Sequence, residues 1–216
     1  DQSFIARGAF GGSVKQVRVT IDDFWDNLIG WWRLNDGEGC QARDSSINSS
    51  HGNLHPDNTG CDVWTSGHGE AESWTTALSF AGGESMTISH NSSLNFGEND
   101  FSVSLWIKPD FENSESWGEE PADGRYYFIT KQAGKSSQGF GAWITSGGDL
   151  ASNINSGGID FINSVSNVFN TVTNEWKHVV FIKEGSTHKL YINGSLESQV
   201  TGGEEEVLGA VNNEDD

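Results

Sequence analysis

The stretch DSSINSSHG, residues 44–52, carries side chains that could bind a metal ion. Asp44 and Asn48 supply the carboxylate and amide oxygens that Ca²⁺ prefers, and backbone carbonyls of a flexible loop can complete its coordination. The same residue types also build turns, because Asp, Asn and Ser side chains hydrogen-bond to their own backbone. The stretch therefore predicts either a calcium site at Asp44 and Asn48 or a turn held by such hydrogen bonds. His51, His55 and His68 lie nearby without a carboxylate at a tight repeated spacing, so we interpret them as ordinary surface histidines.

Aromatic side chains in polar surroundings suggest a second kind of site, one for sugars. Trp64 and Trp117 are flanked by Asp, Glu, Asn and Ser, and the acidic segment 111–127 brings Trp117 close in sequence to Arg125 and Tyr126. An exposed ring can stack on a pyranose while polar neighbours bind its hydroxyls, so these four residues are our candidate ligand-binding residues. The alternative is that each tryptophan covers an open sheet edge or seals the core.

The two cysteines and three glycosylation sequons indicate an extracellular protein. Cys40 and Cys61 lie in loop-like sequence, and a disulfide between them would stabilise the fold by about 3 kcal/mol through chain entropy. The triplets at Asn48, Asn91 and Asn193 match the N-x-S/T acceptor pattern. Asn193 precedes Gly194, and this pair indicates a tight hairpin turn first and a sequon second.

Composition excludes two classes of partner. The formal net charge of −19, with only 12 Lys and Arg, would repel the phosphate backbone of nucleic acid. No apolar run approaches the roughly 18 residues of a membrane-spanning helix, so we expect no membrane insertion. No Gly-x-Ser-x-Gly elbow, phosphate loop or Cys–His signature is present, and we expect no catalysis.

Alternating patterns predict an all-β fold. In FSVSLWIKP, the apolar residues Phe101, Val103 and Leu105 fall on one face, while Trp106 falls on the other with two serines and Lys108. Further strands are expected within 126–132, 139–145, 147–155, 158–166 and the three-strand meander 175–200, with a hairpin joining 77–80 to 84–90. No window shows a helical period. Many short antiparallel strands imply a two-sheet sandwich or jelly roll.

Four stretches resemble the laminin G-like, pentraxin-like jelly rolls of the concanavalin A-like superfamily. They are LIGWWRLNDGEGCQARDSSINSSHGNL, ALSFAGGESMTISHNSSLNFGENDFSVSLWIKPD, YYFITKQAGKSSQGFGAWI and EWKHVVFIKEGSTHKLYINGSLE, in the order of the family. The resemblance implies that the loop of Asp44 holds calcium, together with an acid from the closing strand. The E-x-D-x-x-E strand of the related β-glucanases is absent, which agrees with a non-catalytic domain.

The closing hairpin of that family matches the beginning of this chain. SFIARGAFGGSVKQVRV resembles it, so we predict that residues 1–24 form the closing β-hairpin and residues 25–216 the jelly-roll body. The hairpin would fold onto its own body by circular permutation, complete a neighbouring subunit through residues 1–21, or be left over from a preceding tandem domain. Lys15 and Gln16 occupy the positions of the family's acids, so a Lys15–Asp44 pair could replace the metal.

Together these patterns predict a non-catalytic extracellular or surface domain for recognition or adhesion. Its expected partner is a glycan or glycoprotein, and calcium is its expected cofactor. The alternative is a structural subunit of a surface filament or virion, assembled by strand donation from the N-terminal hairpin.

Overall fold

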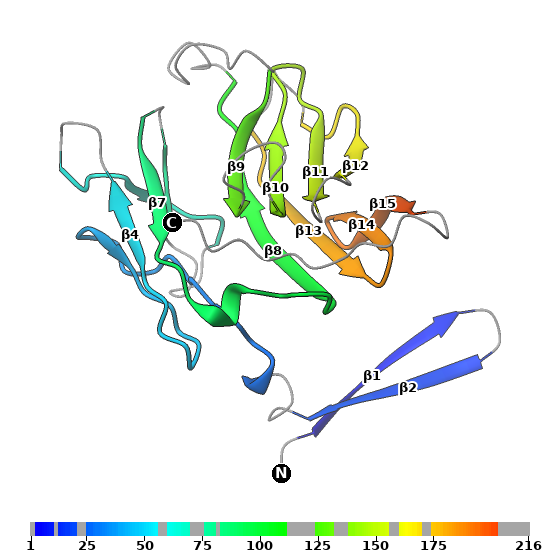
Figure 1. The fold of residues 1–216 in the computed structure, drawn as a ribbon. Coiled ribbons are helices and arrows are strands. Elements are labelled where there is room, and N and C mark those ends of the chain that lie inside the picture. Colours follow the sequence, from blue (N-terminus) through cyan, green and yellow to red (C-terminus); the bar gives the residue numbers. More distant parts are fainter. Residues whose placement is uncertain are drawn as a thin grey trace.

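A computed structural model describes residues 25–55, 60–69, 76–80, 83–111, 124–131, 138–155, 160–169 and 174–202, together with the backbone of residues 3–10 and 13–20 (Figure 1). The predicted all-β sandwich is confirmed, because the described part consists of antiparallel sheets with single helical turns at residues 25–26 and at η1 (Ser92–Leu94). Among the described residues, no helix has the length and apolar character that crossing a membrane requires.

The first layer is a four-stranded antiparallel sheet in the order β15-β14-β13-β8. It is formed by β8 (Phe101–Ile107), β13 (Lys177–Glu184), β14 (Thr187–Ile192) and β15 (Ser195–Thr201). The last three strands are the predicted meander. Asn193 and Gly194 have φ of 49° and 84°, the left-handed pair that a two-residue hairpin turn requires.

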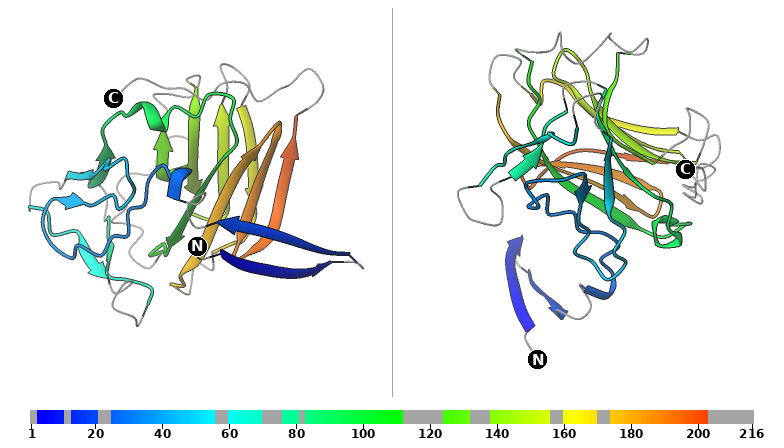
Figure 2. Two further views of the ribbon diagram at one scale, coloured as in Figure 1. Left: turned by 90° about the horizontal axis from the view of Figure 1, so that it is seen from below. Right: turned by 90° about the vertical axis from the view of Figure 1, so that its left-hand side faces the viewer.

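The second layer is a four-stranded antiparallel sheet in the order β12-β11-β10-β9. It consists of β9 (Tyr126–Lys131), β10 (Gly139–Ile144), β11 (Leu150–Asn155) and β12 (Asp160–Val165), as the sequence predicted. Figure 2 shows the two sheets stacked as layers. The hydrophobic core lies between them and is built around Phe101, Phe140, Ile154, Phe181 and Leu190.

Polar side chains are also buried between the layers, and Lys183 is the charged one among the described residues there. Lys183 is 1% exposed, and its Nζ donates to the carbonyl oxygens of Glu98 at 2.7 Å and Asn99 at 3.3 Å. Burial lowers the pKa of Lys183, opposed by the nearby charges of Asp100 and Glu98. The ammonium thereby ties β13 to the turn that precedes β8, which satisfies carbonyls that would otherwise lack a donor.

Shorter strands extend the body beside β8. One sheet has the order β3-β4-β7, formed by β3 (Gln41–Ala42), β4 (Gly52–His55) and β7 (Ser85–Ile88). Another pairs β5 (Trp64–Ser66) with β6 (Thr76–Leu78). The hairpin expected between 77–80 and 84–90 is therefore wrong, because β6 and β7 pair with different strands. Strands of three or four residues contain too little pattern to specify their partner.

The N-terminal segment forms a hairpin of β1 (Ser3–Phe10) and β2 (Ser13–Thr20), in register from Ser3 opposite Thr20 to Phe10 opposite Ser13. The two strands make a two-stranded sheet of their own (Figure 1). Closure of a sandwich by residues 1–24 stays a prediction, as does the division at residue 25. The side chains of Lys15 and Gln16 lie outside the described residues, and with them the expected Lys15–Asp44 pair.

Candidate functional site

An open groove of about 500 Å³ lies at the edge of the first sheet. We call it the aromatic groove, and it is lined by His68, Trp106, Trp176, His178, Asn193 and Gly194. Its volume falls within the range typical of ligand sites in proteins. Among the described residues that line the groove, none is a carboxylate.

Strand alternation places Trp106 on the outer face of β8. Val103, Leu105 and Ile107 point into the core, whereas Trp106 is 40% exposed. β8 is an edge strand, and its neighbour β13 sets His178 directly opposite Trp106 with ring centroids 5.2 Å apart. An indole and an imidazole therefore lie side by side on an otherwise solvated sheet face.

The other two rings come from segments outside the strands. His68 follows β5 and stacks on Trp106, with centroids 3.9 Å apart and planes 26° from parallel. Trp176 precedes β13 and meets His68 edge-on at 6.0 Å. Lys108 Nζ lies 5.5 Å from the Trp176 ring, within cation–π distance. These four rings make a mixed apolar and polar surface rather than an apolar cavity.

Hydrogen bonds hold the polar side of the groove in place. Ser104 Oγ and His178 Nε2 share a hydrogen bond of 2.8 Å. Asn193 Oδ1 accepts from the backbone N–H of His178 at 3.0 Å, and the Asn193 N–H donates to the carbonyl of His178 at 2.8 Å. This two-bond clamp fixes the turn at Asn193-Gly194 against β13, so the groove is bounded by rigid elements.

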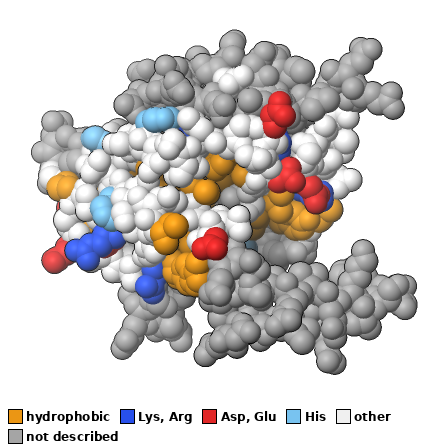
Figure 3. Space-filling view, turned by 60° about the horizontal axis from the view of Figure 1, so that its bottom comes forward, with side chains coloured by type: hydrophobic (Ala, Val, Ile, Leu, Met, Phe, Trp, Pro, Cys, Tyr) orange, Lys and Arg blue, Asp and Glu red, His pale blue; other side chains and the backbone are white. Residues whose placement is uncertain are grey.

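The groove offers the chemistry of sugar recognition. Ring faces pack against the C–H side of a pyranose, while imidazole and amide groups bind hydroxyls. On the face shown in Figure 3, exposed hydrophobic side chains form small patches among polar atoms, not one continuous apolar area. Within the described part of the chain, no group of three or more His, Cys, Asp or Glu could hold a metal ion.

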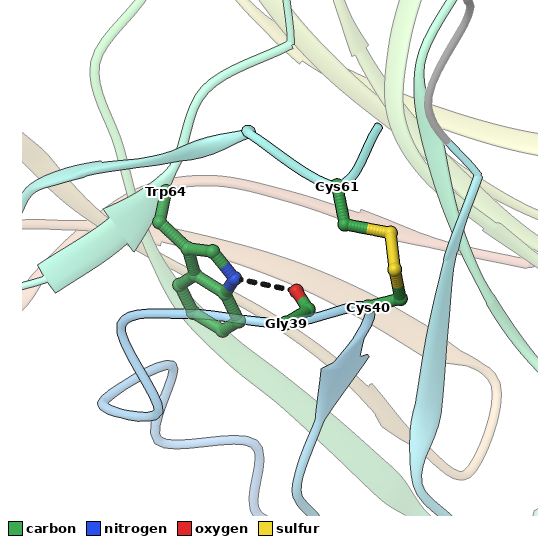
Figure 4. Close-up of a disulfide and its surroundings, with 4 residues drawn as sticks. All are labelled: Gly39, Cys40, Cys61 and Trp64. Atoms are coloured by element: carbon green, nitrogen blue, oxygen red, sulfur yellow. Dashed lines mark hydrogen bonds between the residues drawn. A yellow bond between two sulfur atoms is a disulfide. The ribbon is translucent and has the colours of Figure 1, made fainter. Parts of the chain in front are cut away.

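Trp64, one of the predicted ligand residues, is engaged with its own loop. Its Nε1 donates to the carbonyl of Gly39 at 2.8 Å, beside the disulfide that joins Cys40 to Cys61 (Figure 4). The predicted disulfide is thus present, with Cα atoms 5.0 Å apart and 21 residues of separation. Trp64 and the disulfide together fix the segment that connects β3 to β5.

Arg125 and Tyr126 lie at the start of β9, on the opposite layer from the aromatic groove. The guanidinium of Arg125 stacks over the buried ring of Trp143 at 4.5 Å, and Nη1 approaches the Tyr127 hydroxyl at 3.4 Å. Tyr126 packs against the core, and Tyr127 rather than Tyr126 is the exposed ring. Trp117 lies outside the described residues. The structure therefore does not bring Trp64 together with Arg125 and Tyr126.

Asp44 organises the loop that was expected to bind calcium. Its Oδ1 accepts from the N–H groups of Trp31 and Ser46, both at 2.8 Å. Its Oδ2 accepts from Ser46 Oγ at 2.7 Å and from the Ser50 N–H at 2.9 Å. Asp44 as a whole residue is 5% exposed. Burial raises its pKa, but these four hydrogen bonds outweigh burial and leave the pKa of Asp44 below its ordinary value of 3.8.

This arrangement does not fit a calcium ion as it stands. Four protein donors occupy the carboxylate of Asp44, and Asn48 Nδ2 donates to the carbonyl of Ile29 at 2.8 Å. A cation would have to displace N–H groups from Asp44, whereas calcium needs six to eight free oxygens. Calcium binding stays a prediction that only titration can test.

The predicted glycosylation sites lie in three settings. Asn48 belongs to the Asp44 loop, Asn91 caps the turn of η1, and Asn193 lines the aromatic groove. Of the groove residues, the sequence predicts only Asn193 as a site, and it places Trp106 in a strand and His68 on the surface. The available signal was the alternation in FSVSLWIKP, which sets Trp106 alone among polar residues on the outward face.

Comparison with known proteins agrees with this architecture. The family model described as the concanavalin A-like lectin/glucanases superfamily, a laminin G model, matches residues 80–214. No curated protein matches the chain. Among solved structures, the chain is similar to an S-layer domain-containing protein (residues 221–444) from Clostridium thermocellum ATCC 27405, with 15% identity and a TM-score of 0.45. The alignment covers 79% of this chain and 71% of that chain. Because the family model matches well over half of the chain, the chain belongs to the concanavalin A-like lectin/glucanases superfamily.

Proposed function

We propose that this protein is a non-catalytic, extracellular recognition domain that binds a glycan in the aromatic groove. The observation that carries the proposal is the exposed Trp106, flanked by His68 and His178 on a rigid sheet edge. Membership of a superfamily of lectins and glucanases supports carbohydrate as the ligand class. The Cys40–Cys61 disulfide supports an oxidising, extracellular setting.

Among the described residues, the groove lining consists of aromatic, imidazole and amide groups, which supports binding by stacking and hydrogen bonds. Stacking on a ring face is tolerant of sugar identity, and the imidazole and amide groups would add selectivity for hydroxyl arrangement. We therefore expect weak binding to single sugars and tighter binding to oligosaccharides that cover both Trp106 and Trp176.

The test is a glycan array read with protein produced without glycosylation, comparing wild type with Trp106→Ala. We expect at least tenfold weaker binding, about 1.4 kcal/mol, for Trp106→Ala. Trp25→Ala is the matched control, because Trp25 is 38% exposed against 40% for Trp106 but does not line the groove. Unchanged binding by Trp106→Ala would refute the groove as the site.

A third variant tests the ligand residues predicted from the sequence. Trp117→Ala removes the aromatic ring of the acidic segment. The sequence predicts that this ring binds the glycan together with Arg125, Tyr126 and Trp64. If the array signal is lost in Trp117→Ala and kept in Trp106→Ala, the ligand binds at that segment rather than in the aromatic groove.

A second candidate function is a structural subunit assembled by strand donation. The observation in its favour is that β1 and β2 pair with each other and with no other described strand. A lone two-stranded hairpin is at best marginally stable in water, so it gains most by adding to a sheet edge. Ordered fibres that form from purified protein and are lost on deletion of residues 1–21 would favour this function. A monomeric mass at all concentrations would exclude it.

A further inference from the structure

The three sequon asparagines differ in whether their amide nitrogen is available. Asn48 Nδ2 donates to the carbonyl of Ile29 at 2.8 Å, and Asn91 Nδ2 donates to Ser50 Oγ at 2.9 Å. Both are partly buried. A glycan on either nitrogen would have to replace a hydrogen bond that holds the Asp44 loop together.

Asn193 is arranged differently. It is exposed, and the contact of its side chain with the fold is made by Oδ1, which accepts from the His178 N–H at 3.0 Å. Within the described residues, Nδ2 has no hydrogen-bond partner. The clamp on Oδ1 therefore survives when Nδ2 carries a substituent, and Ser195 completes the sequon at the first position of β15.

Asn193 also lines the aromatic groove, beside Trp106, Trp176 and His178. A sugar linked to its Nδ2 would start from a residue that lines the groove, close to those rings. We propose that Asn193 is an N-glycosylation site of this protein and that the attached glycan packs in the aromatic groove. Glycosylation would then block the groove against external glycans, and this consequence rests on the proposed function.

The transfer requires a lipid-linked oligosaccharyl diphosphate as donor. Asn193 Nδ2 forms a bond to the anomeric carbon of the first sugar, while the bond from that carbon to the diphosphate breaks. The diphosphate leaves with the lipid, and the amide gives up one proton.

Occupancy is measured on protein secreted from eukaryotic cells, by peptide mass mapping before and after enzymatic removal of N-glycans. We expect Asn193 to be modified and Asn48 and Asn91 to be unmodified. Ser195→Ala should abolish the modification while keeping Asn193 and its clamp on His178, which Asn193→Gln would not. An unmodified Asn193 in the secreted wild type overturns the proposal.

Packing of the glycan in the groove is tested by a double-mutant cycle in which melting temperatures are compared. Stacking on Trp106 should raise the Tm of the glycosylated wild type by about 3 °C over secreted Ser195→Ala. Trp106→Ala should erase this difference, whereas Trp25→Ala should preserve it. If glycosylation changes the Tm by the same amount in wild type and in Trp106→Ala, packing of the glycan in the groove is refuted, even if Asn193 is modified.

The two proposals fail separately. If unglycosylated protein binds no glycan but the Tm difference depends on Trp106, packing of the attached glycan in the groove is supported and recognition of external glycans is refuted. If unglycosylated protein binds glycans and secreted Asn193 is unmodified, external recognition stands and this inference is overturned. If both hold, glycosylated wild type should bind the array at least tenfold more weakly than secreted Ser195→Ala.

Discussion

Replacing Asp44 by Asn should destabilise the fold, because one carboxylate holds four donors. The asparagine keeps the shape, but an NH₂ group then replaces one oxygen and faces two of the donors from Trp31, Ser46 and Ser50. A hydrogen bond to a charged group contributes about 1.5–3 kcal/mol, so losing two costs about 3–6 kcal/mol. Relief of the desolvation of a buried charge offsets part of this. We expect a net loss of about 3 kcal/mol at pH 7.

The stability lost in Asp44→Asn should be greatest at neutral pH and should decrease in acid. The pKa of Asp44 lies below 3.8 in the folded state, so the carboxylate contributes stability above pH 3.8. That contribution is lost as the pH falls through the folded pKa, where the folded carboxyl also becomes protonated. The gap between wild type and Asp44→Asn should therefore stay constant from pH 8 to about 5 and shrink below about 3.8.

The assay is thermal unfolding of both proteins across this pH range. For a domain of this size, about 3 kcal/mol corresponds to a Tm lower by about 6–12 °C at neutral pH. Asp62→Asn is the control, since Asp62 is exposed and should change stability by less than about 0.5 kcal/mol. Equal Tm values for wild type and Asp44→Asn at pH 7, or a gap that persists unchanged in acid, would refute the reasoning.

Three further predictions follow from the loops and the core. Replacing Cys40 and Cys61 by Ser should cost about 3 kcal/mol from chain entropy over the 21-residue separation, seen as a lower midpoint in denaturant, and an unchanged midpoint would contradict it. Lys183→Met should cost at least about 2 kcal/mol, because the carbonyls of Glu98 and Asn99 lose their donor, and hydrogen exchange should accelerate in the turn before β8. Saturating calcium should leave the Tm of chelator-treated protein unchanged, because donors already occupy the Asp44 carboxylate; a rise of several degrees would establish the calcium site.

Much of the fold could be predicted from local patterns. The alternation in residues 101–107 predicts which side of β8 faces the core, since side chains of a strand point to opposite faces in turn. Turn residues such as Gly185 and Asn193-Gly194 mark where the meander reverses. The short strands were harder to place: β6 and β7 look like a hairpin in sequence, yet β6 pairs with the preceding strand β5, and β7 pairs with β4 from further back in the chain.

Individual residues of the candidate sites could be predicted from the sequence, but their partners could not. Asp44 is recognisable as a loop residue, but whether its oxygens face a cation or four N–H and O–H donors depends on where Trp31 and Ser50 are brought by folding. Trp64 and Trp106 are both tryptophans, but folding gives their side chains different environments. Trp64 donates to a carbonyl of its own loop, whereas Trp106 is partly exposed on the outer sheet face with His68 stacked on it.

Local sequence therefore specifies strands, turns and inward faces, because these depend on neighbours within a few residues along the chain. The aromatic groove has a different origin, since His68, Trp106 and His178 come from three separate segments, which meet only when β8 pairs with β13 and the segment after β5 packs beside them. The availability of Asn193 Nδ2, in contrast to that of Asn48 and Asn91, likewise depends on long-range hydrogen bonds. Contacts between distant segments follow from packing, and no local pattern encodes them.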